Sequence, residues 1–370
     1  MNMKSNTLWN YDIKRITTIF IIISVLLSIT LFFSIEKYYE SDLALSARLI
    51  KNNDFQIMLF VVRPITLILA YISPQDPIQS LSILSLLSYL ASVYLSYKFT
   101  KEVYDENSAL LASYLLATNF AVILVSSAPM ADIPSLASNL AILYLFFNKL
   151  KNTIKSKKAW LMYGLFTSLL ILVRENVLTS VIAICVILYY KKAYRQLMVY
   201  LSSVFIVLIG WQLFTTIQFN MNYLTQLSTG LSLSVKYSGV FYNPIKVMSY
   251  LMSGLTPLLI ILALIGILLD EDEERFKIVH FLALPSLLLA ILWPAIYEPR
   301  VAIIALPGVI HLCGYGLNSL ITQLSKKPFY KNCGNSLLLT ILLTLNLVSN
   351  LFLAYINNGF KISPIWRFLR

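Results

Sequence analysis

The sequence predicts an all-α protein, a polytopic transmembrane helical bundle with about 11 spans. Apolar residues make up 58% of the 370 residues, whereas only 12% are charged. Because a soluble domain carries roughly 25% charged residues, most of this surface must face lipid. The apolar residues also form long blocks: residues 16–35 contain no charge, and a helix of this length matches the ~30 Å hydrocarbon core.

The order of the apolar blocks predicts the individual spans. The first block follows Lys4, Lys14 and Arg15 and lacks a small-residue cleavage site, so we interpret it as a retained helix rather than a signal peptide. The predicted spans are 16–35, 78–97, 107–126, 133–148, 159–173, 176–190, 196–216, 248–269, 278–293, 301–317 and 336–356.

Two apolar segments contain charges that argue against simple spans. Arg63-Pro64 interrupts the block 57–72, and an arginine at mid-bilayer beside a proline disfavours a spanning helix. We therefore expect residues 41–72 to form one or two helices at the membrane interface. Arg174-Glu175 interrupts residues 159–190, which are too long for one span. A hairpin places this pair at the interface and both flanking basic clusters on one side of the membrane.

The distribution of basic residues predicts the orientation. A cytoplasmic N-terminus places most Lys and Arg residues inside, as the positive-inside rule requires. This reading explains the net charge of +12 without a nucleic-acid partner. We expect residues 1–370 to form a single transmembrane domain in the cell membrane, with an external C-terminus. Its largest outer loops are 36–77, which contains the interfacial helices, and 217–247.

Ionisable residues at the outer ends of the spans form the candidate site. The chain has no Gly-rich phosphate loop, and its scattered cysteines and two histidines argue against a zinc site built from those ligands. Asp132 lies in a short loop between two prolines, Asp42 begins an interfacial segment, and Arg300 opens a span after Pro299. A guanidinium there suits an anionic lipid headgroup. The residues on this face are Glu40, Asp42, Asp132, Arg174, Glu175, Glu298 and Arg300.

These charged residues lie in short motifs, and the order of the motifs over roughly residues 10–320 resembles that of the GT-C superfamily of membrane glycosyltransferases. The likeness is greatest to the branch of protein O-mannosyltransferases and lipid A aminoarabinose transferases. Two departures stand out: the acidic pair is separated by a serine, and the His-Pro-Pro-Leu-like segment lacks its histidine. The motifs are Glu40-Ser41-Asp42, Val62-Arg63-Pro64-Ile65, Met130-Ala131-Asp132-Ile133-Pro134-Ser135, Leu172-Val173-Arg174-Glu175-Asn176 and Tyr297-Glu298-Pro299-Arg300-Val301.

The resemblance implies an inverting hexosyl- or pentosyltransferase at the external membrane face. Its donor would be a sugar on polyprenyl phosphate, and its acceptor a hydroxyl of a protein, lipid or glycan. Asp42 would be the catalytic base, with Glu40 and Asp132 as further catalytic candidates. A divalent cation (Mg²⁺, Mn²⁺ or Zn²⁺) would be held by Asp42 and Asp132. The carrier phosphate and substrate would be bound by Arg300, Arg174, Glu175, Arg63 and Glu298.

Other functional classes remain open. A transporter or flippase of lipid-linked substrates predicts ionisable residues near mid-bilayer and broken helices in repeated halves. Neither feature is evident in the sequence. A glycan ligase or polymerase would share the outer arginines, and only the order of Asp42 and Asp132 argues against it.

Overall fold

The apolar blocks of the sequence form the helices of the computed structural model, which describes residues 3–34, 42–52, 62–126, 128–150, 156–229, 244–292, 301–325 and 335–359. These ranges are helical and contain no strand, which confirms the predicted all-α class. The helices are α1 (Met3–Ser34), α2 (Asp42–Lys51), α4 (Pro64–Ile72), α5 (Pro77–Val103), α6 (Glu106–Thr118), α7 (Phe120–Ser126), α8 (Asp132–Leu145), α9 (Lys157–Ile171), α10 (Leu178–Tyr190), α11 (Tyr194–Phe219), α13 (Pro244–Leu268), α14 (Glu273–Leu292), α15 (Ala302–Ser325) and α17 (Asn335–Gly359).

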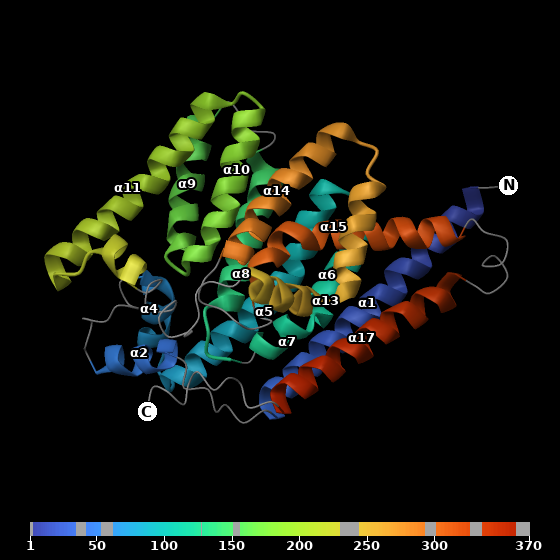
Figure 1. Ribbon diagram of the computed structural model, residues 1–370, viewed down its shortest axis with the longest axis horizontal. Coiled ribbons are helices and arrows are strands. Elements are labelled where there is room, and N and C mark those ends of the chain that lie inside the picture. The colour runs from blue at the N-terminus through green and yellow to red at the C-terminus, as the bar shows by residue number, and fades with distance from the viewer. Residues whose placement is uncertain are drawn as a thin grey trace.

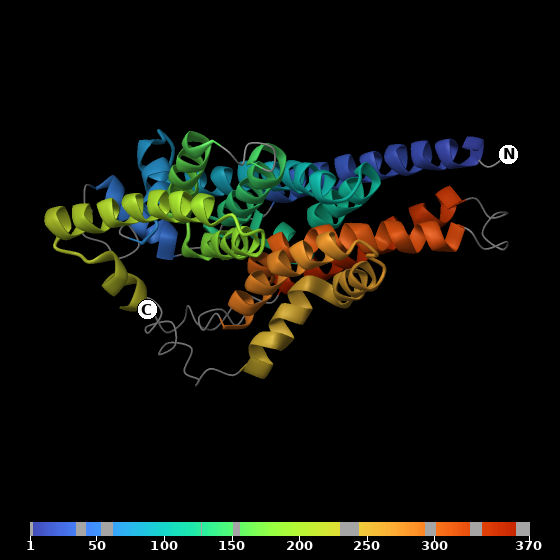
Figure 2. The same ribbon diagram turned by 90° about the horizontal axis from the view of Figure 1, so that it is seen from above.

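The helices form two layers. Figures 1 and 2 show α13, α14, α15 and α17 in one layer, and the helices that precede them in the chain in the other. Seven of the described helices are long and apolar enough to cross a membrane, or eight if α6 and α7 form one bent span. The chain is thus a multi-pass membrane protein. The predicted count of 11 spans is not confirmed, because α8, α9 and α10, with 14, 15 and 13 residues, are shorter than the roughly 20 residues that a span needs.

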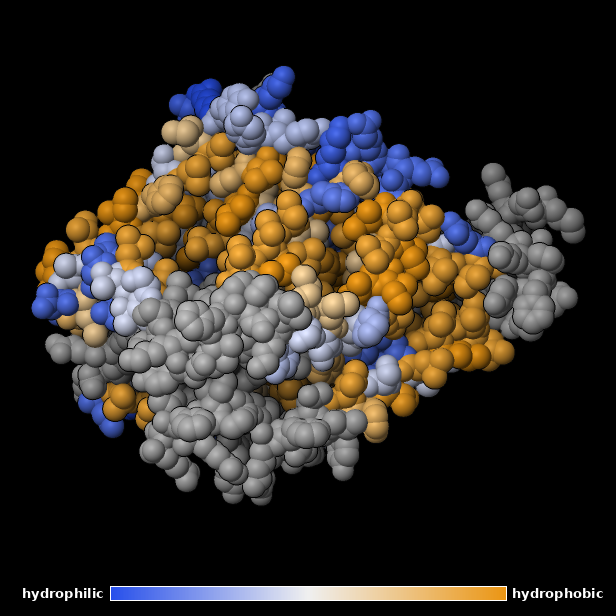
Figure 3. All heavy atoms as spheres, viewed as in Figure 1, coloured by the Kyte–Doolittle hydropathy of each residue, from blue (hydrophilic) through white to orange (hydrophobic). Residues whose placement is uncertain are grey.

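The predicted hairpin at residues 159–190 is confirmed. Helix α9 ends at Ile171, the chain reverses through a 3-10 turn (Glu175–Val177), and α10 returns (Figure 1). Lys157 and Lys191 at its two open ends are both exposed. Figure 3 shows polar side chains along this edge of the molecule, next to a broad apolar surface. Lys157 and Lys191 therefore lie at one end of the bundle and the Arg174-Glu175 tip at the other.

Glycines bring α13 and α15 into close contact. A Cβ atom on Gly316 would lie 2.0 Å from the carbonyl oxygen of Leu262, and one on Gly266 would lie 2.4 Å from the carbonyl oxygen of Leu312. Small residues allow this approach of helix backbones in membranes, where packing rather than the hydrophobic effect drives association. Helix α15 is the most buried of the described membrane-crossing helices, so this contact lies in the centre of the bundle.

Gly316→Ala is expected to destabilise the bundle by about 1–3 kcal/mol, because the backbone of α13 must move to admit the methyl group. Thermal unfolding in detergent measures the effect. The matched control is Gly210→Ala in α11, where nothing lies within 4 Å of the added Cβ. Equal unfolding temperatures for the two variants would contradict the close packing of α13 on α15.

Two helices predicted as continuous spans are broken. The block 107–126 bends by 58° between α6 and α7 at Asn119. Helix α13, in the block 248–269, is interrupted at Thr256 (φ 64°, ψ 148°), before Pro257. Proline lacks the N–H that continues a helix, and a positive φ is rare for a β-branched residue. Asn119 braces both breaks: its Nδ2 donates to the Gly254 carbonyl at 3.0 Å, and its Oδ1 accepts from the Val122 N–H at 3.2 Å.

Helix α17 adds further polar support to the bend between α6 and α7. Asn350 Oδ1 accepts from the Phe120 N–H at 3.1 Å, and Asn346 Nδ2 donates to Thr118 Oγ1 at 2.8 Å. Both asparagines are buried. Neighbouring helices commonly satisfy the backbone groups that a break frees inside a membrane, and here asparagine side chains do so.

Candidate active site

The segment between α1 and α5, which the sequence predicts to be the first outer loop, docks on the tip of the α9–α10 hairpin. Its described parts are α2 and α4, which confirms the helices predicted for residues 41–72. Pro64 is tolerated in the first turn of α4, where the missing N–H needs no partner. The Ile65 N–H donates to the Leu172 carbonyl at 3.3 Å, and Thr66 Oγ1 donates to the Val173 carbonyl at 3.0 Å. These bonds hold the N-terminus of α4 against the tip.

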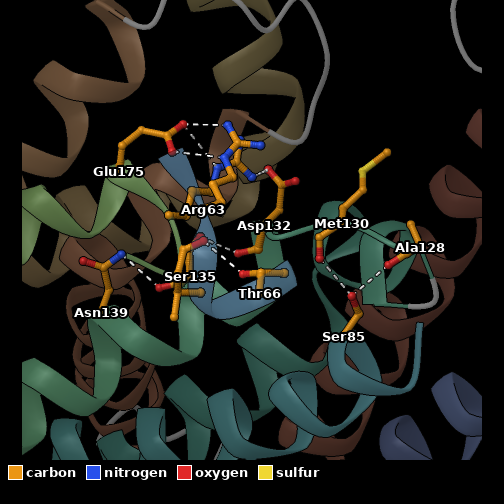
Figure 4. A network of polar contacts seen from close by, with 11 residues as sticks. Arg63, Thr66, Ser85, Ala128, Met130, Asp132, Ser135, Asn139 and Glu175 are labelled. Carbon is orange, nitrogen blue, oxygen red and sulfur yellow. Dashed lines mark hydrogen bonds and ion pairs between the residues drawn. The ribbon is translucent and has the colours of Figure 1, made fainter. Parts of the chain in front are cut away.

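Docking of α4 brings four charged side chains together into what we call the charge array: Arg63, Glu175, Arg174 and Asp132 (Figure 4). Arg63 forms a bidentate pair with Glu175, with Nη2–Oε1 2.7 Å and Nε–Oε2 3.1 Å. Arg174 Nη1 pairs with Asp132 Oδ1, and Arg174 Nε lies 3.9 Å from Glu175 Oε1. Positive and negative groups alternate, so the array has no net charge.

The array is largely buried. The side chains of Asp132, Arg174 and Glu175 are 3%, 5% and 5% exposed, whereas that of Arg63 is 21% exposed. Burial raises the pKa of the Glu175 carboxyl, but the charge and hydrogen bonds of Arg63 lower it by more, so the net shift is downward. Glu175 is therefore ionised at neutral pH. Arg63 is the member of the array that is most accessible to solvent.

The loop before α8 is held by a serine of α5. Ser85 Oγ lies 2.7 Å from the Ala128 carbonyl oxygen and 3.0 Å from that of Met130, and it hydrogen-bonds to both (Figure 4). Asp132 then begins α8, where the helix dipole favours a negative charge. The backbone that carries Asp132 is thus fixed on both sides of the carboxylate.

A second set of polar contacts ties α8 to α10. Asn139 lies two helical turns after Asp132, and its Nδ2 donates to the Ser135 carbonyl at 3.0 Å. Its Oδ1 accepts from Thr179 Oγ1 at 3.1 Å and from Ser180 Oγ at 2.5 Å. These bonds set the position of α8 relative to the hairpin, and with it the position of Asp132 relative to Arg174.

The chain after α11 folds back over the tip. Residues 223–229 are helical, and Tyr223, which is buried, packs with Leu172 and Trp211. Burial, and then the charge of Glu175, raise the pKa of Tyr223 to about 12. The tyrosine therefore stays protonated beside Glu175. Tyr223 and Asn139 are not among the site residues predicted from the sequence.

Four of the predicted site residues meet in the charge array, and the others are not placed by the structure. Asp42 begins α2, but its side chain lies outside the described residues. Glu40, Glu298 and Arg300 also lie outside them. In the described part of the chain, no group of three or more His, Cys, Asp or Glu side chains could hold a metal ion.

The chain resembles known proteins in part of its sequence and in its fold. Residues 61–219, which contain the whole charge array, match the family described as dolichyl-phosphate-mannose-protein mannosyltransferase. No curated protein matches the chain. Solved structures of the Archaeoglobus fulgidus oligosaccharyltransferase are similar in fold. The structure tethered with an acceptor peptide has a TM-score of 0.56 at 14% identity, and the match covers 91% of this chain and 54% of that one.

Two further structures of that enzyme give similar values. The complex of AglB with an inhibitory peptide and a dolichol-phosphate has a TM-score of 0.56 at 13% identity, with 91% and 55% of the two chains covered. The complex with Zn and sulfate has a TM-score of 0.51 at 14% identity, with 90% and 52% covered. The chain thus spans about half the length of these structures, and the likeness establishes a shared fold.

Proposed function

We propose that the protein is a membrane glycosyltransferase of the GT-C type, which the matched family and the similar solved structures support. It transfers a hexosyl or pentosyl group from a polyprenyl phosphate to a hydroxyl of a protein, lipid or glycan. The reaction takes place at the external face of the cell membrane. The description of the matched family, which includes a dolichyl-phosphate sugar, and the dolichol-phosphate bound to AglB support a lipid-linked donor.

The charge array is the observation that carries this proposal. Three segments far apart in the sequence supply its members: the loop before α4, the start of α8 and the tip of the hairpin. A buried ion pair adds little stability compared with apolar residues of similar volume, so packing alone does not account for it. Arg63, at the accessible edge, presents a guanidinium, the group best suited to a phosphate oxygen pair.

The proposed reaction is a single displacement. Asp42 accepts the proton of the acceptor hydroxyl while its oxygen attacks the anomeric carbon. The bond from that carbon to the carrier phosphate breaks, the phosphate leaves with the electron pair, and the configuration is inverted. Arg63 and Arg300 bind the phosphate and stabilise its developing charge. Glu40 is the alternative base, and Asp132 is the second carboxylate that acts together with Asp42.

Glu298 and Glu175 have supporting parts in this proposal. Glu298 lies two residues from Arg300, so it is expected to orient that guanidinium or a sugar hydroxyl. Glu175 holds both Nε and Nη2 of Arg63. Arg63 is thereby fixed before the donor arrives, which lowers the entropic cost of binding.

The direct test uses the purified protein in proteoliposomes with radiolabelled sugars on polyprenyl phosphate and a mixture of peptide, lipid and glycan acceptors. We expect covalent transfer of the label to one acceptor class. An Arg63→Ala/Glu175→Gln protein serves as the inactive control. It lacks the Arg63–Glu175 ion pair, but neither substitution leaves the other residue as an unpaired charge. Absence of transfer from every polyprenyl-phosphate sugar would contradict the proposal.

A flippase of lipid-linked substrates is the alternative that the broken helices favour. Helix α13 and the α6–α7 pair are both interrupted inside the bundle, as in many transporters. The same proteoliposomes distinguish the two functions. A flippase moves the labelled lipid between leaflets without forming a new glycosidic bond. A glycan ligase or polymerase, a further alternative, would link whole glycans rather than single sugars.

Single-cysteine labelling tests which side the charge array faces. In a background without Cys185, Cys313 and Cys333, a membrane-impermeant maleimide is expected to label Gln75→Cys in intact cells. Glu271→Cys is expected to react only after permeabilisation. Both side chains are exposed, and they lie at the predicted outer and inner ends of the bundle. The reverse pattern would place the array on the cytoplasmic face.

A further inference from the structure

We infer that Arg174 acts as the fixed cation of this site and takes the part of a divalent metal ion at Asp132. The motifs led us to expect a cation bound by Asp42 and Asp132. In the structure, the Asp132 carboxylate forms an ion pair with Arg174, and both side chains are buried. This inference rests on the proposed function, but it concerns a binding property that can be measured separately.

Among the residues that the structure describes, the groups around Asp132 do not fit a metal site. Mg²⁺ requires six ligands and Zn²⁺ four, supplied by carboxylates or other donors in set geometry. The second carboxylate of the array, Glu175, is bound by Arg63 through both of its oxygens. A metal ion beside Arg174 would also be repelled by the positive charge of the guanidinium, and this repulsion is only weakly screened in a buried site.

Arg174 is instead placed between the two carboxylates. Its Nη1 pairs with Asp132, and its Nε lies 3.9 Å from Glu175 Oε1. The backbone on either side is held as well: the Val173 carbonyl accepts from Thr66, and the Arg174 carbonyl accepts from the Val177 N–H at 3.1 Å. Its positive charge is thus preorganised at the site, as electrostatic stabilisation of a leaving phosphate requires.

Arg174 is therefore a positioning residue that orients Asp132 and keeps a positive charge at the array. Removal of its side chain should free the Asp132 carboxylate for a metal ion that the wild-type protein does not bind there. This predicted gain distinguishes the inference from a purely structural role, in which loss of Arg174 would only reduce stability.

The test counts Mn²⁺ bound per purified chain, by electron paramagnetic resonance after equilibrium dialysis. Wild type and Asp132→Asn are expected to bind the same amount. Arg174→Ala is expected to bind an additional Mn²⁺, and Arg174→Ala/Asp132→Asn to lose it. The matched control is Lys14→Ala, because Lys14 pairs at 2.8 Å with an exposed carboxylate outside the array, that of Glu106, and Lys101 remains 3.9 Å from that carboxylate in the variant. This control should not gain Mn²⁺.

Transfer assays on the same proteins give a second readout. We expect kcat of Arg174→Ala to fall and to be partly restored by Mn²⁺, whereas added Mn²⁺ leaves the kcat of wild type and of Lys14→Ala unchanged. A Mn²⁺ in wild type that depends on Asp132, or no additional Mn²⁺ in folded Arg174→Ala, overturns the inference. If Arg174→Ala does not fold, the Mn²⁺ counts of wild type and Asp132→Asn still test the inference, because a lower count in Asp132→Asn would overturn it. If no protein transfers sugar, the proposed function fails, but the Mn²⁺ counts keep their meaning.

Discussion

Asp42→Asn is expected to lower the rate of sugar transfer by roughly 10²- to 10⁴-fold, the usual contribution of a general base. The amide keeps the size and shape of the carboxyl but cannot accept the proton of the acceptor hydroxyl. Asp42 begins α2, in the segment that the motifs assign to the base. Donor affinity should remain near that of wild type, because the base does not hold the carrier phosphate. Steady-state kcat and equilibrium donor binding measure the two effects separately.

Two further variants control this experiment. Glu40→Gln should retain most activity if Asp42 is the base, and Asp132→Asn should affect both turnover and donor binding through the charge array. A normal rate in Asp42→Asn beside an inactive Glu40→Gln would transfer the role of base to Glu40. Normal rates in all three variants would contradict the catalytic roles that the GT-C resemblance assigns to these residues.

Arg63→Ala is expected to reduce transfer roughly 100-fold, because a hydrogen-bonded ion pair to phosphate contributes a few kcal/mol. The substitution also leaves Glu175 buried without its bidentate partner, which costs about 3–5 kcal/mol of stability. Arg63→Ala/Glu175→Gln removes both charges and should recover most of that stability while it stays inactive. The rate of transfer, the KM for the donor and the unfolding temperature separate the two consequences.

An exposed ion pair provides the matched control. Lys14 and Glu106 are paired at 2.8 Å with side chains 44% and 40% exposed, and such pairs contribute little to stability. Lys14→Ala/Glu106→Gln should therefore unfold and transfer sugar like wild type. A fully active Arg63→Ala/Glu175→Gln protein would show that Arg63 lies outside the phosphate site.

The sequence was sufficient to predict features that depend on local composition. The hairpin followed from one charged dipeptide, Arg174-Glu175, inside an apolar stretch with basic residues at both ends. Arg63-Pro64 excluded a spanning helix, and α4 begins at that proline. In both cases a continuous span would place a charged side chain near mid-bilayer, and the cost of that charge disfavours such a helix.

The breaks in α6–α7 and α13 could not be predicted in the same way. One asparagine or one Thr-Pro pair changes the mean hydropathy of a block very little. The conformation at these breaks depends on the hydrogen bonds that Asn119 makes to the Gly254 carbonyl in α13 and to the Val122 N–H in α7. Such breaks are one of two features expected of a transporter, but the residues that brace them are uncharged.

Pairing within the charge array is also a tertiary feature. The motifs placed its four residues on one side of the membrane, but 112 positions separate Arg63 from Glu175. Their bidentate contact follows from the docking of α4 on the hairpin tip. Tyr223 and Asn139 were missed because a tyrosine in a loop and an asparagine in an apolar helix carry no motif. The spacing of Asn139, seven residues after Asp132, was the available signal.

The short helices of the hairpin determine how deep in the membrane the proposed reaction centre lies. Helix α9 has 15 residues and α10 has 13, or about 22 and 20 Å along their axes, whereas the hydrocarbon core is ~30 Å thick. A hairpin that starts at the inner surface therefore ends several ångströms below the outer headgroups, unless the bilayer thins around it. A carrier phosphate would have to sink toward Arg63, while the acceptor descends from outside. The thickness of the surrounding lipid thus becomes a determinant of turnover, and we expect transfer to be faster in shorter-chain phosphatidylcholine than in longer-chain bilayers.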